Sequence, residues 1–242
     1  MHYFYGMTQK GKRGQKNKDC FLIDDFVVNC GFKKKQSKKN GFVLSVADGL
    51  GSALYGDIAS QYILTQFSNN RKLLSRALAI TMIDNANSYL LKKYQGNATT
   101  VFTMICGSDE KILIFHVGDT RAYKLTKRNL IQLTNDHTEV QKLVDWGVIG
   151  ENMRIYNNKK HIVSQCLGYY PKICIDIYPN TFEHGEMLLL TSDGIHDYLS
   201  QEHMESILRK SINIETNANG LIQAAVQQGS TDDLTVVIVK YI

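Results

Sequence analysis

Short acidic motifs at the ends of apolar, strand-like runs are the most constraining feature of this 242-residue chain. They are Ala-Asp-Gly-Leu-Gly at 47–51, Val-Gly-Asp-Thr-Arg at 117–121, Thr-Ser-Asp-Gly at 191–194 and Ser-Thr-Asp-Asp-Leu at 230–234. Aspartate is depleted in strand interiors, so one carboxylate at each strand end is locally ordinary. The repetition is what constrains the fold, because strand ends that face each other would bring several carboxylates to one place.

Converging carboxylates indicate a metal. Like charges in contact repel, and some of the groups then have to bind protons. A hard divalent cation such as Mg²⁺ or Mn²⁺ removes the conflict, since it prefers carboxylate, carbonyl and water oxygens. Taken singly, each motif is also compatible with an ordinary turn, because Asp, Gly, Ser and Thr are common there.

Length and composition limit the architecture. The length fits one large domain or two small ones, and the scarcity of proline (2 residues) with no Ser-rich linker favours one. No apolar run approaches 18 residues and the N-terminal sequence lacks a secretory signal pattern, so we expect no membrane span. The five cysteines are scattered and never form a CxxC motif, which predicts reduced thiols and a cytoplasmic location.

Five lysines within seven residues carry much of the net charge of +5. They are Lys33, Lys34, Lys35, Lys38 and Lys39. We interpret them as a solvated hairpin tip between strands at 26–30 and 42–46. The alternative is an electrostatic contact with an acidic partner or nucleic acid. No aromatic residues interleave with the lysines, so nucleic acid is not expected.

The periodicity of apolar residues predicts an α+β fold of antiparallel sheets with helices packed outside them. Strands are expected near 3–7, 20–23, 26–30, 42–46, 100–105, 112–116, 121–125, 173–178, 187–190 and 234–241, and helices near 58–67, 73–94, 139–146, 202–210 and 218–227. Strands come in blocks and helices in pairs, without a regular βαβ alternation.

In this order and with their flanks, the motifs resemble those of the bacterial-type metal-dependent serine/threonine phosphatases of the protein phosphatase 2C family. The resemblance runs from about Gly11 to Val239 and includes Val-Gly-Asp-Thr-Arg-Ala-Tyr at 117–123 and Leu-Thr-Asn-Asp-His-Thr at 133–138. It implies two stacked antiparallel sheets flanked by helices, an α/β/β/α sandwich. It also implies one catalytic domain over 1–242 with a flap-like segment at about 145–165.

The resemblance assigns two metal ions, Mn²⁺ or Mg²⁺, and possible ligands for a third. Asp48, Asp193 and Asp232 match the ligands of the first ion, and Asp48 with the Gly49 carbonyl matches those of the second. Asp119, with Asp193, matches a third-metal site of bacterial members. Asp19 matches a residue that holds metal-bound water.

The chain departs from the family pattern near the first motif. The arginine that usually binds the substrate phosphate is replaced by Gly14, and we expect Arg13 to serve instead, with Lys16 as the alternative. Lys18 stands where many members have Glu or Gln, and it would compete with the second metal unless it pointed to solvent. Asp233 replaces the usual Asn.

Other conspicuous side chains are assigned structural roles. His137 is expected at a helix start rather than in catalysis, and His116 in the core or at its rim. Trp146 and Val148 are expected to pack within the flap-like segment.

The leading hypothesis is a protein serine/threonine phosphatase in which a water bridging two divalent metals attacks the phosphoester. Its catalytic residues would be Asp48, Asp193, Asp232 and Arg13. Its partner would be a phosphorylated protein, the target of a serine/threonine kinase, with no nucleic acid, no membrane and a monomeric chain.

Two alternatives come from other functional classes. The first is a catalytically weak or inactive relative that binds phosphoproteins as an interaction module; Gly14 and Lys18 favour it and the intact aspartates oppose it. The second is a metal-dependent nuclease, which the order of the motifs does not support.

Overall fold

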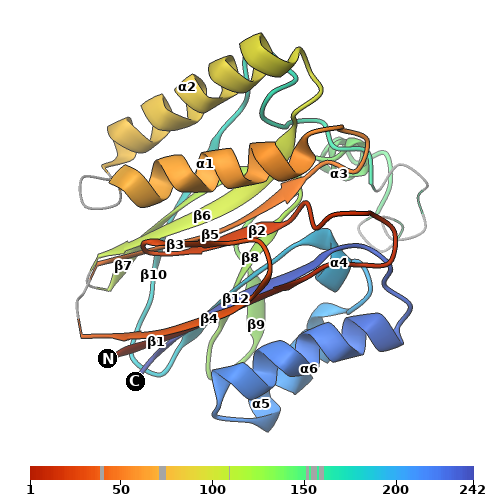
Figure 1. The fold of residues 1–242 in the computed structure, drawn as a ribbon. Helices are drawn as coiled ribbons and strands as arrows, with labels where there is room; N and C mark the ends of the chain where they lie inside the picture. The colour runs from red at the N-terminus through yellow and green to blue at the C-terminus, as the bar shows by residue number, and fades with distance from the viewer. Residues whose placement is uncertain (39–40, 71–74, 109, 151–152, 154–156, 158–160) are drawn as a thin grey trace.

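The computed structural model describes residues 1–38, 41–70, 75–108, 110–150, 153, 157 and 161–242. Two antiparallel six-stranded sheets lie face to face, with a pair of long helices over the outer face of each (Figure 1). This arrangement confirms the expected α+β sandwich of two sheets between helical layers.

The first sheet contains both ends of the chain. Its strands are β1 (His2–Gln9), β4 (Gly31–Ser37), β8 (Arg121–Leu125), β9 (Leu130–Gln132), β11 (Met187–Thr191) and β12 (Leu234–Tyr241). Their spatial order is β4-β1-β12-β11-β8-β9. The central pairing joins β1 to β12, with His2 opposite Tyr241 and Gln9 opposite Leu234.

The second sheet is built from the strands that surround the first acidic motif. Its strands are β2 (Cys20–Ile23), β3 (Phe26–Val28), β5 (Phe42–Gly49), β6 (Thr100–Ser108), β7 (Lys111–Val117) and β10 (Asp176–Thr181). Their order is β10-β7-β6-β5-β2-β3. Pro179 lies on the edge strand β10, where a residue without an N–H is tolerated.

Six helices complete the described fold. They are α1 (Gly56–Asn70), α2 (Arg76–Tyr94), α3 (Glu139–Asp145), α4 (Asp193–His196), α5 (Gln201–Lys210) and α6 (Ile214–Gln227). Side chains cap several N-termini, as when Ser75 Oγ accepts the Leu78 N–H at α2 and Thr138 Oγ1 accepts the Gln141 N–H at α3.

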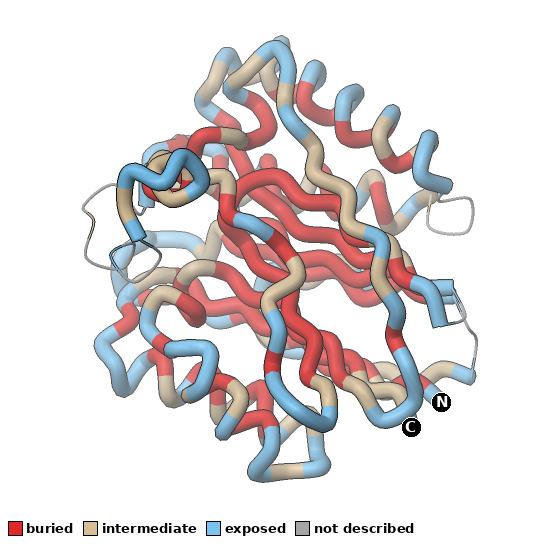
Figure 2. Tube along the Cα trace, turned by 180° about the vertical axis from the view of Figure 1, so that it is seen from behind, coloured by how far each residue is buried: buried red, intermediate tan, exposed pale blue. Residues whose placement is uncertain are grey.

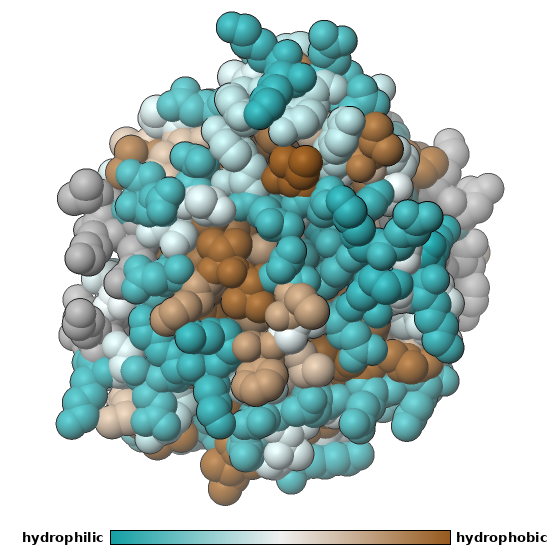
Figure 3. Space-filling view, in the orientation of Figure 1, coloured by the Kyte–Doolittle hydropathy of each residue, from teal (hydrophilic) through white to brown (hydrophobic). Residues whose placement is uncertain are grey.

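The core has three layers of apolar contacts. Phe21, Leu44 and Val237 belong to a fully buried cluster of residues from both sheets. Helices α1 and α2 cover the second sheet, and α5 and α6 cover the first. Central strands are therefore buried on both faces and read as continuous apolar runs (Figure 2). The side of the molecule that faces the viewer in Figure 3 is mainly hydrophilic, with apolar side chains in separate patches.

The interpretation of the lysine cluster as a hairpin tip is wrong. Residues Gly31–Ser37 form β4, an edge strand that leaves the second sheet and pairs with β1 of the first. The strand lacks a run of apolar residues, and lysines are common on sheet edges because they oppose pairing with other chains. Lys39 lies outside the described residues.

Several other expectations need correction. The strand expected at 173–178 is β10 and begins at Asp176, and both β9 and α4 were missed. Trp146 and Val148 do not pack, since they are 73% and 64% exposed. The start of the helix expected at 73 and much of the flap-like segment lie outside the described residues.

Candidate metal centre

Five of the sequence-predicted aspartates converge where the two sheets meet at one end of the sandwich. Asp48 ends β5 and Asp19 precedes β2 in one sheet, while Asp232 precedes β12 and Asp193 follows β11 in the other. Asp119 lies in the turn between β7 and β8. The structure thus brings together carboxylates that are up to 213 residues apart, from Asp19 to Asp232.

The carboxylates strongly perturb one another. Desolvation raises the pKa of Asp48 well above its usual range, and the charges of Asp19 and Asp193 raise it further. Desolvation and neighbouring carboxylates, Asp232 first among them, raise the pKa of Asp193 to about 7. A side-chain hydrogen bond with Asp48 acts in the opposite direction and lowers the pKa of Asp193, and two carboxyls can make such a bond only while one of them holds a proton.

Asp119 is a buried carboxylate on the β7–β8 side of the cluster. It is 8% exposed, and desolvation followed by the Asp193 charge raises its pKa well above the usual range. A cavity of about 350 Å³ adjoins it and includes Arg121 and Asp136 among its lining residues. Arg121 Nε donates to Asp136 Oδ1 at 2.8 Å, and this buried pair braces the strand that follows Asp119.

Hydroxyl groups hold Asp19 in place. Its Oδ2 accepts hydrogen bonds from Ser192 Oγ at 2.7 Å and Thr235 Oγ1 at 2.6 Å. The Thr235 N–H donates to Ser192 Oγ in turn, at 3.0 Å. Ser192 of the third motif and Thr235, directly after the fourth, therefore orient a carboxylate from the other end of the chain.

Asp233, the acid that replaces an asparagine, binds backbone groups. Its Oδ1 accepts the Gly11 N–H at 2.8 Å and its Oδ2 accepts the Lys18 N–H at 2.7 Å. These two bonds fasten the N-terminal loop to the start of β12. The added carboxylate is consequently occupied by the loop rather than by the aspartate cluster.

Glycines permit two close approaches at the site. A Cβ on Gly49 would lie 2.3 Å from the carbonyl carbon of Gly56, so only glycine lets α1 begin against the end of β5. A Cβ on Gly194 would lie 2.0 Å from the Asp233 carbonyl oxygen. The Asp-Gly sequences at both strand ends therefore have a packing reason as well as a turn preference.

The two candidate phosphate anchors lie in different places. Arg13 Nη1 is 3.3 Å from Asp232 Oδ2, at the edge of the aspartate cluster, and 76% of the Arg13 side chain is exposed. Lys16 Nζ is 3.1 Å from Asp57 Oδ2, in the first turn of α1. Among the described residues, the Lys18 ammonium is paired with neither Asp232 nor Asp57. It donates instead to carbonyls of the loop that follows Gly49.

His137 braces the turn that holds Asp119. Its Nδ1 accepts the Gly118 N–H at 3.2 Å, and its Nε2 lies 3.2 Å from Asp176 Oδ2. The hydrogen bond from His137 is the main reason that the pKa of Asp176 falls to about 2. His116 is fully buried with Nδ1 2.9 Å from Thr103 Oγ1, and burial lowers its pKa to about 4.

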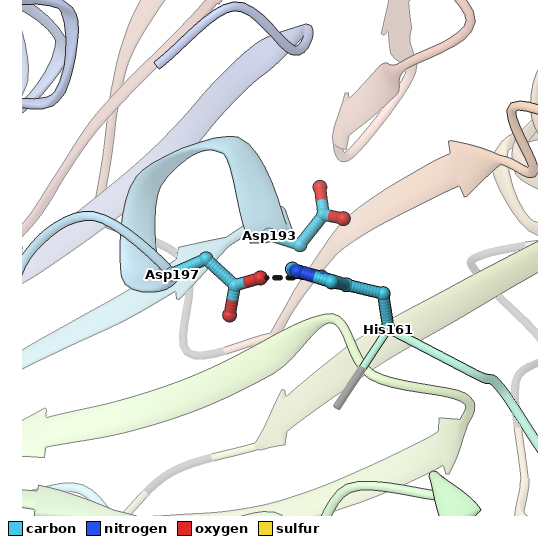
Figure 4. A group of neighbouring side chains, drawn as sticks. All are labelled: His161, Asp193 and Asp197. Atoms are coloured by element: carbon cyan, nitrogen blue, oxygen red, sulfur yellow. Dashed lines mark ion pairs between the residues drawn. The ribbon is translucent and has the colours of Figure 1, made fainter. Parts of the chain in front are cut away.

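One group of metal-capable side chains was missed from the sequence. His161 Nδ1 lies 2.9 Å from Asp197 Oδ2, and ligand atoms of these residues and Asp193 all lie within 4.8 Å of one another (Figure 4). Asp197 follows Asp193 by four residues, one helical turn, and that spacing was a usable signal. His161 comes from the flap-like segment, and no local pattern pointed to it.

The donor set fits a hard divalent cation. Several carboxylates converge with raised pKa values, and a cation would relieve the repulsion that contributes to these shifts. No helix in the described part of the chain is long and apolar enough to cross a membrane.

Comparisons with known proteins identify a family. A family model described as "Protein phosphatase 2C" matches residues 24–228. The serine/threonine phosphatase stp of Listeria monocytogenes serovar 1/2a is 28% identical over 222 residues, covering 85% of this chain and 86% of that protein. The protein phosphatase PhpP of Streptococcus pneumoniae strain R6 is 26% identical over 246 residues, covering 97% and 95%.

Solved structures share the fold. The serine/threonine phosphatase Stp1 from Staphylococcus aureus aligns with a TM-score of 0.85 at 24% identity, covering 99% of this chain and 94% of that chain. The catalytic domain of the serine/threonine protein phosphatase PstP, described in complex with two manganese ions, aligns with a TM-score of 0.77 at 24% identity, covering 99% of each.

The metal-free protein should lose stability as the pH rises. A carboxyl whose pKa is raised on folding, as for Asp193 from 3.8 to about 7, contributes stability that is complete below its unfolded pKa. That contribution is lost as the pH rises through the folded value. Thermal melts in EDTA should therefore show a falling Tm between about pH 5 and pH 8. The lowered pKa of Asp176 changes the stability only at pH values below this range.

Bound Mn²⁺ should reverse this dependence, because the metal replaces protons on the carboxyls. The increase in Tm on adding Mn²⁺ should be larger at pH 8 than at pH 5.5. Asp193→Asn is the matched control and should flatten the slope measured in EDTA. A Tm in EDTA that is constant or rises over this range in the unsubstituted protein would contradict the raised pKa of Asp193.

Proposed function

The chain belongs to the protein phosphatase 2C family, and from this premise we propose that it hydrolyses phosphoserine and phosphothreonine in proteins with the help of two divalent metal ions, Mn²⁺ or Mg²⁺. The family is one of protein phosphatases, which are hydrolases, and the relatives named above carry that description. The observation that carries the metal-dependent mechanism is the convergence of aspartates from both sheets, among which Asp48, Asp119 and Asp193 have raised pKa values.

The proposed ligand roles follow the match of these residues to the family motifs. Asp48, Asp193 and Asp232 would hold the first ion, and Asp48 with the Gly49 carbonyl the second. Asp119, with Asp193, would hold a third, more weakly bound ion. The manganese ions of the PstP structure support the class of metal, not the choice between Mn²⁺ and Mg²⁺.

The chemistry needs this arrangement because a phosphomonoester is an anion that repels hydroxide. Two bound divalent ions would lower the pKa of a shared water towards neutrality and neutralise the charge that develops on the phosphate. The chain's own contribution is orientation. Asp19, whose Oδ2 is engaged by two hydroxyls, would use Oδ1 to position a water, and Arg13 would bind phosphate oxygens at the rim.

A cysteine nucleophile is disfavoured. Burial raises the pKa of Cys20 and of Cys166 to about 12, so neither thiol forms the thiolate that a cysteine-dependent phosphatase requires. The cluster of carboxylates and the raised thiol pKa values thus point to the same water-dependent reaction class.

The competing hypothesis remains an inactive phosphoprotein-binding relative. Gly14 in place of the phosphate-binding arginine favours it, whereas Arg13 beside Asp232 supports catalysis. Hydrolysis of p-nitrophenyl phosphate and a phosphothreonine peptide with Mn²⁺, Mg²⁺ or EDTA separates the two. Turnover that requires metal supports the phosphatase, and peptide binding without turnover supports the alternative.

Further parts of this proposal concern the cellular setting. The substrate would be a phosphorylated protein that a serine/threonine kinase has modified, and the chain would act as a monomer. The five free cysteines support a reducing, cytoplasmic location.

Asp193→Asn and Asp232→Asn should each abolish Mn²⁺-dependent turnover while the fold is kept. An amide retains the shape of the carboxylate and removes a ligand charge. Steady-state kinetics, with circular dichroism as the check on folding, measure this. Near-wild-type activity of either variant at modest Mn²⁺ would contradict the first-ion assignment.

Asp119→Ala should reduce activity and spare the two tight metal sites. Asp119 lies on the β7–β8 turn, and in the proposed assignment it holds only the third ion, so its loss should affect only that ion. Calorimetric titration with Mn²⁺ should still show two tight sites. Loss of one of them would contradict this placement.

Arg13→Ala should mainly raise KM, by about tenfold. This corresponds to about 1.5 kcal/mol, the lower end for a charge-assisted hydrogen bond, because the Arg13 side chain is 76% exposed. The control is Lys16→Ala, which should change KM little because Lys16 pairs with Asp57. A larger KM effect for Lys16→Ala than for Arg13→Ala would make Lys16 the anchor.

A further inference from the structure

Lys18 binds the loop that follows Gly49 through its side chain. The ammonium donates to the carbonyl oxygens of Gly51 at 2.9 Å and Ala53 at 2.7 Å, and it lies 3.5 Å from that of Leu50. An ammonium group has three N–H donors and no acceptor, so three converging carbonyls match its capacity. Within the described residues, no ion pair with a carboxylate involves Lys18.

The main chain of Lys18 binds the other side of the same segment. Its carbonyl oxygen accepts the Gly49 N–H at 3.1 Å and Ser60 Oγ of α1 at 2.6 Å. Its N–H donates to Asp233 at 2.7 Å. One residue therefore connects the end of β5, the loop after it, the first helix and the start of β12.

Other restraints on this loop act mainly through its N–H groups. The Leu50 N–H donates to the Thr99 carbonyl at 3.1 Å, and the Tyr55 N–H donates to that of Asn97 at 2.9 Å. Apolar packing adds little at Leu54, which is 69% exposed, although Ala53 is buried. The Leu50 carbonyl also accepts the Ala53 N–H at 2.9 Å. The Lys18 ammonium supplies the contacts to the Gly51 and Ala53 carbonyls.

We propose that Lys18 is a positioning residue whose ammonium acts as an internal cation: it holds the loop at residues 50–53 in the metal-free protein and so presents the Gly49 carbonyl to the second metal ion. The metal part rests on the proposed function, and the loop part does not. The carbonyl dipoles point their negative ends at the ammonium, so its repulsion of a nearby metal is partly cancelled.

This role differs from that of an acid or amide at the same position. A carboxylate would be repelled by the carbonyl oxygens, whereas an ammonium is attracted to them. The departure from the family pattern at Lys18 is therefore a change in how the loop is held, and it does not by itself indicate an inactive site.

The first measurement is hydrogen exchange in the metal-free protein. Lys18→Met keeps most of the stem and removes the charge, and it should speed exchange of the hydrogen-bonded Leu50, Ala53 and Tyr55 amides by about tenfold. Lys16→Met is the matched control and should leave these amides unchanged, because Lys16 contacts Asp57 instead. Unchanged exchange in Lys18→Met would overturn the proposal.

Chemical rescue tests whether the cation itself matters. In Lys18→Ala, added propylammonium should restore the protection of the Ala53 amide, and propanol, which has the same length without the charge, should not. Equal effects of both compounds would show that only the volume of the side chain is used, which would overturn the internal-cation role. Lys18→Arg keeps the charge and should retain most of the protection. This variant is the control in case Lys18→Ala does not fold.

Calorimetric titration with Mn²⁺ tests the link to the metal. Lys18→Met should weaken the second Mn²⁺ about tenfold and change the first less than threefold. Equal or tighter binding of the second ion would overturn the positioning role. If the unsubstituted protein binds no Mn²⁺ while the exchange result holds, the proposed function fails and the loop anchor stands. If it binds two ions and exchange does not change, the anchor alone fails.

Discussion

Repulsion among carboxylates at the edge shared by the two sheets is the constraint on which the rest of the structure depends. Asp48, Asp119 and Asp193 all have raised pKa values, and desolvation is the first cause of each. The surrounding groups limit this cost. Hydroxyls donate to Asp19, an exposed arginine contacts Asp232, and backbone N–H groups occupy Asp233. In a fold that places like charges together in this way, a bound cation would relieve the repulsion among the carboxylates.

The sandwich makes this arrangement possible because its central strands are buried on both faces. Apolar contacts from the two sheets and from the helices outside them fix where β5, β11 and β12 end. The aspartates then need only to occupy the first polar positions beyond those strands. The helix α4 starts directly at Asp193 and α1 starts at Gly56, and Gly49 and Gly194 leave room for the neighbouring backbone at these two strand ends.

The sequence predicted those parts of the fold in which local pattern and burial agree. The strand at Arg121–Leu125 was located correctly because turn residues precede it, and the final strand at Leu234–Tyr241 because it is largely apolar. The strand at Gly31–Ser37 was missed because Phe32, which stacks on Tyr5 of β1, is its one apolar side chain beyond glycine, and backbone pairing leaves no apolar signature. The aspartates were found through motifs, but the contacts of Lys18 and His161 depend on loops distant in sequence and had no local signal.

Two residues of the flap-like segment show the opposite error, in which burial was predicted and exposure was found. Trp146 and Val148 were expected to pack because apolar side chains usually do, yet both extend into solvent beyond the end of α3. Burial depends on whether another element covers a segment, and a short helix at the periphery of a sandwich has few neighbours. The hydropathy of a residue alone could not supply that information.

The bonds that Asp233 makes with Gly11 and Lys18 span 222 and 215 residues of sequence, and those of Asp19 with Ser192 and Thr235 span 173 and 216. Loop-closure entropy must be overcome before such contacts form. During synthesis, the second sheet can assemble around β5 and β6 while β12 is still within the ribosome. The charged edge then acquires Asp232 and its last strand only after residues 232–241 have emerged, so the nascent chain lacks part of the aspartate cluster until then.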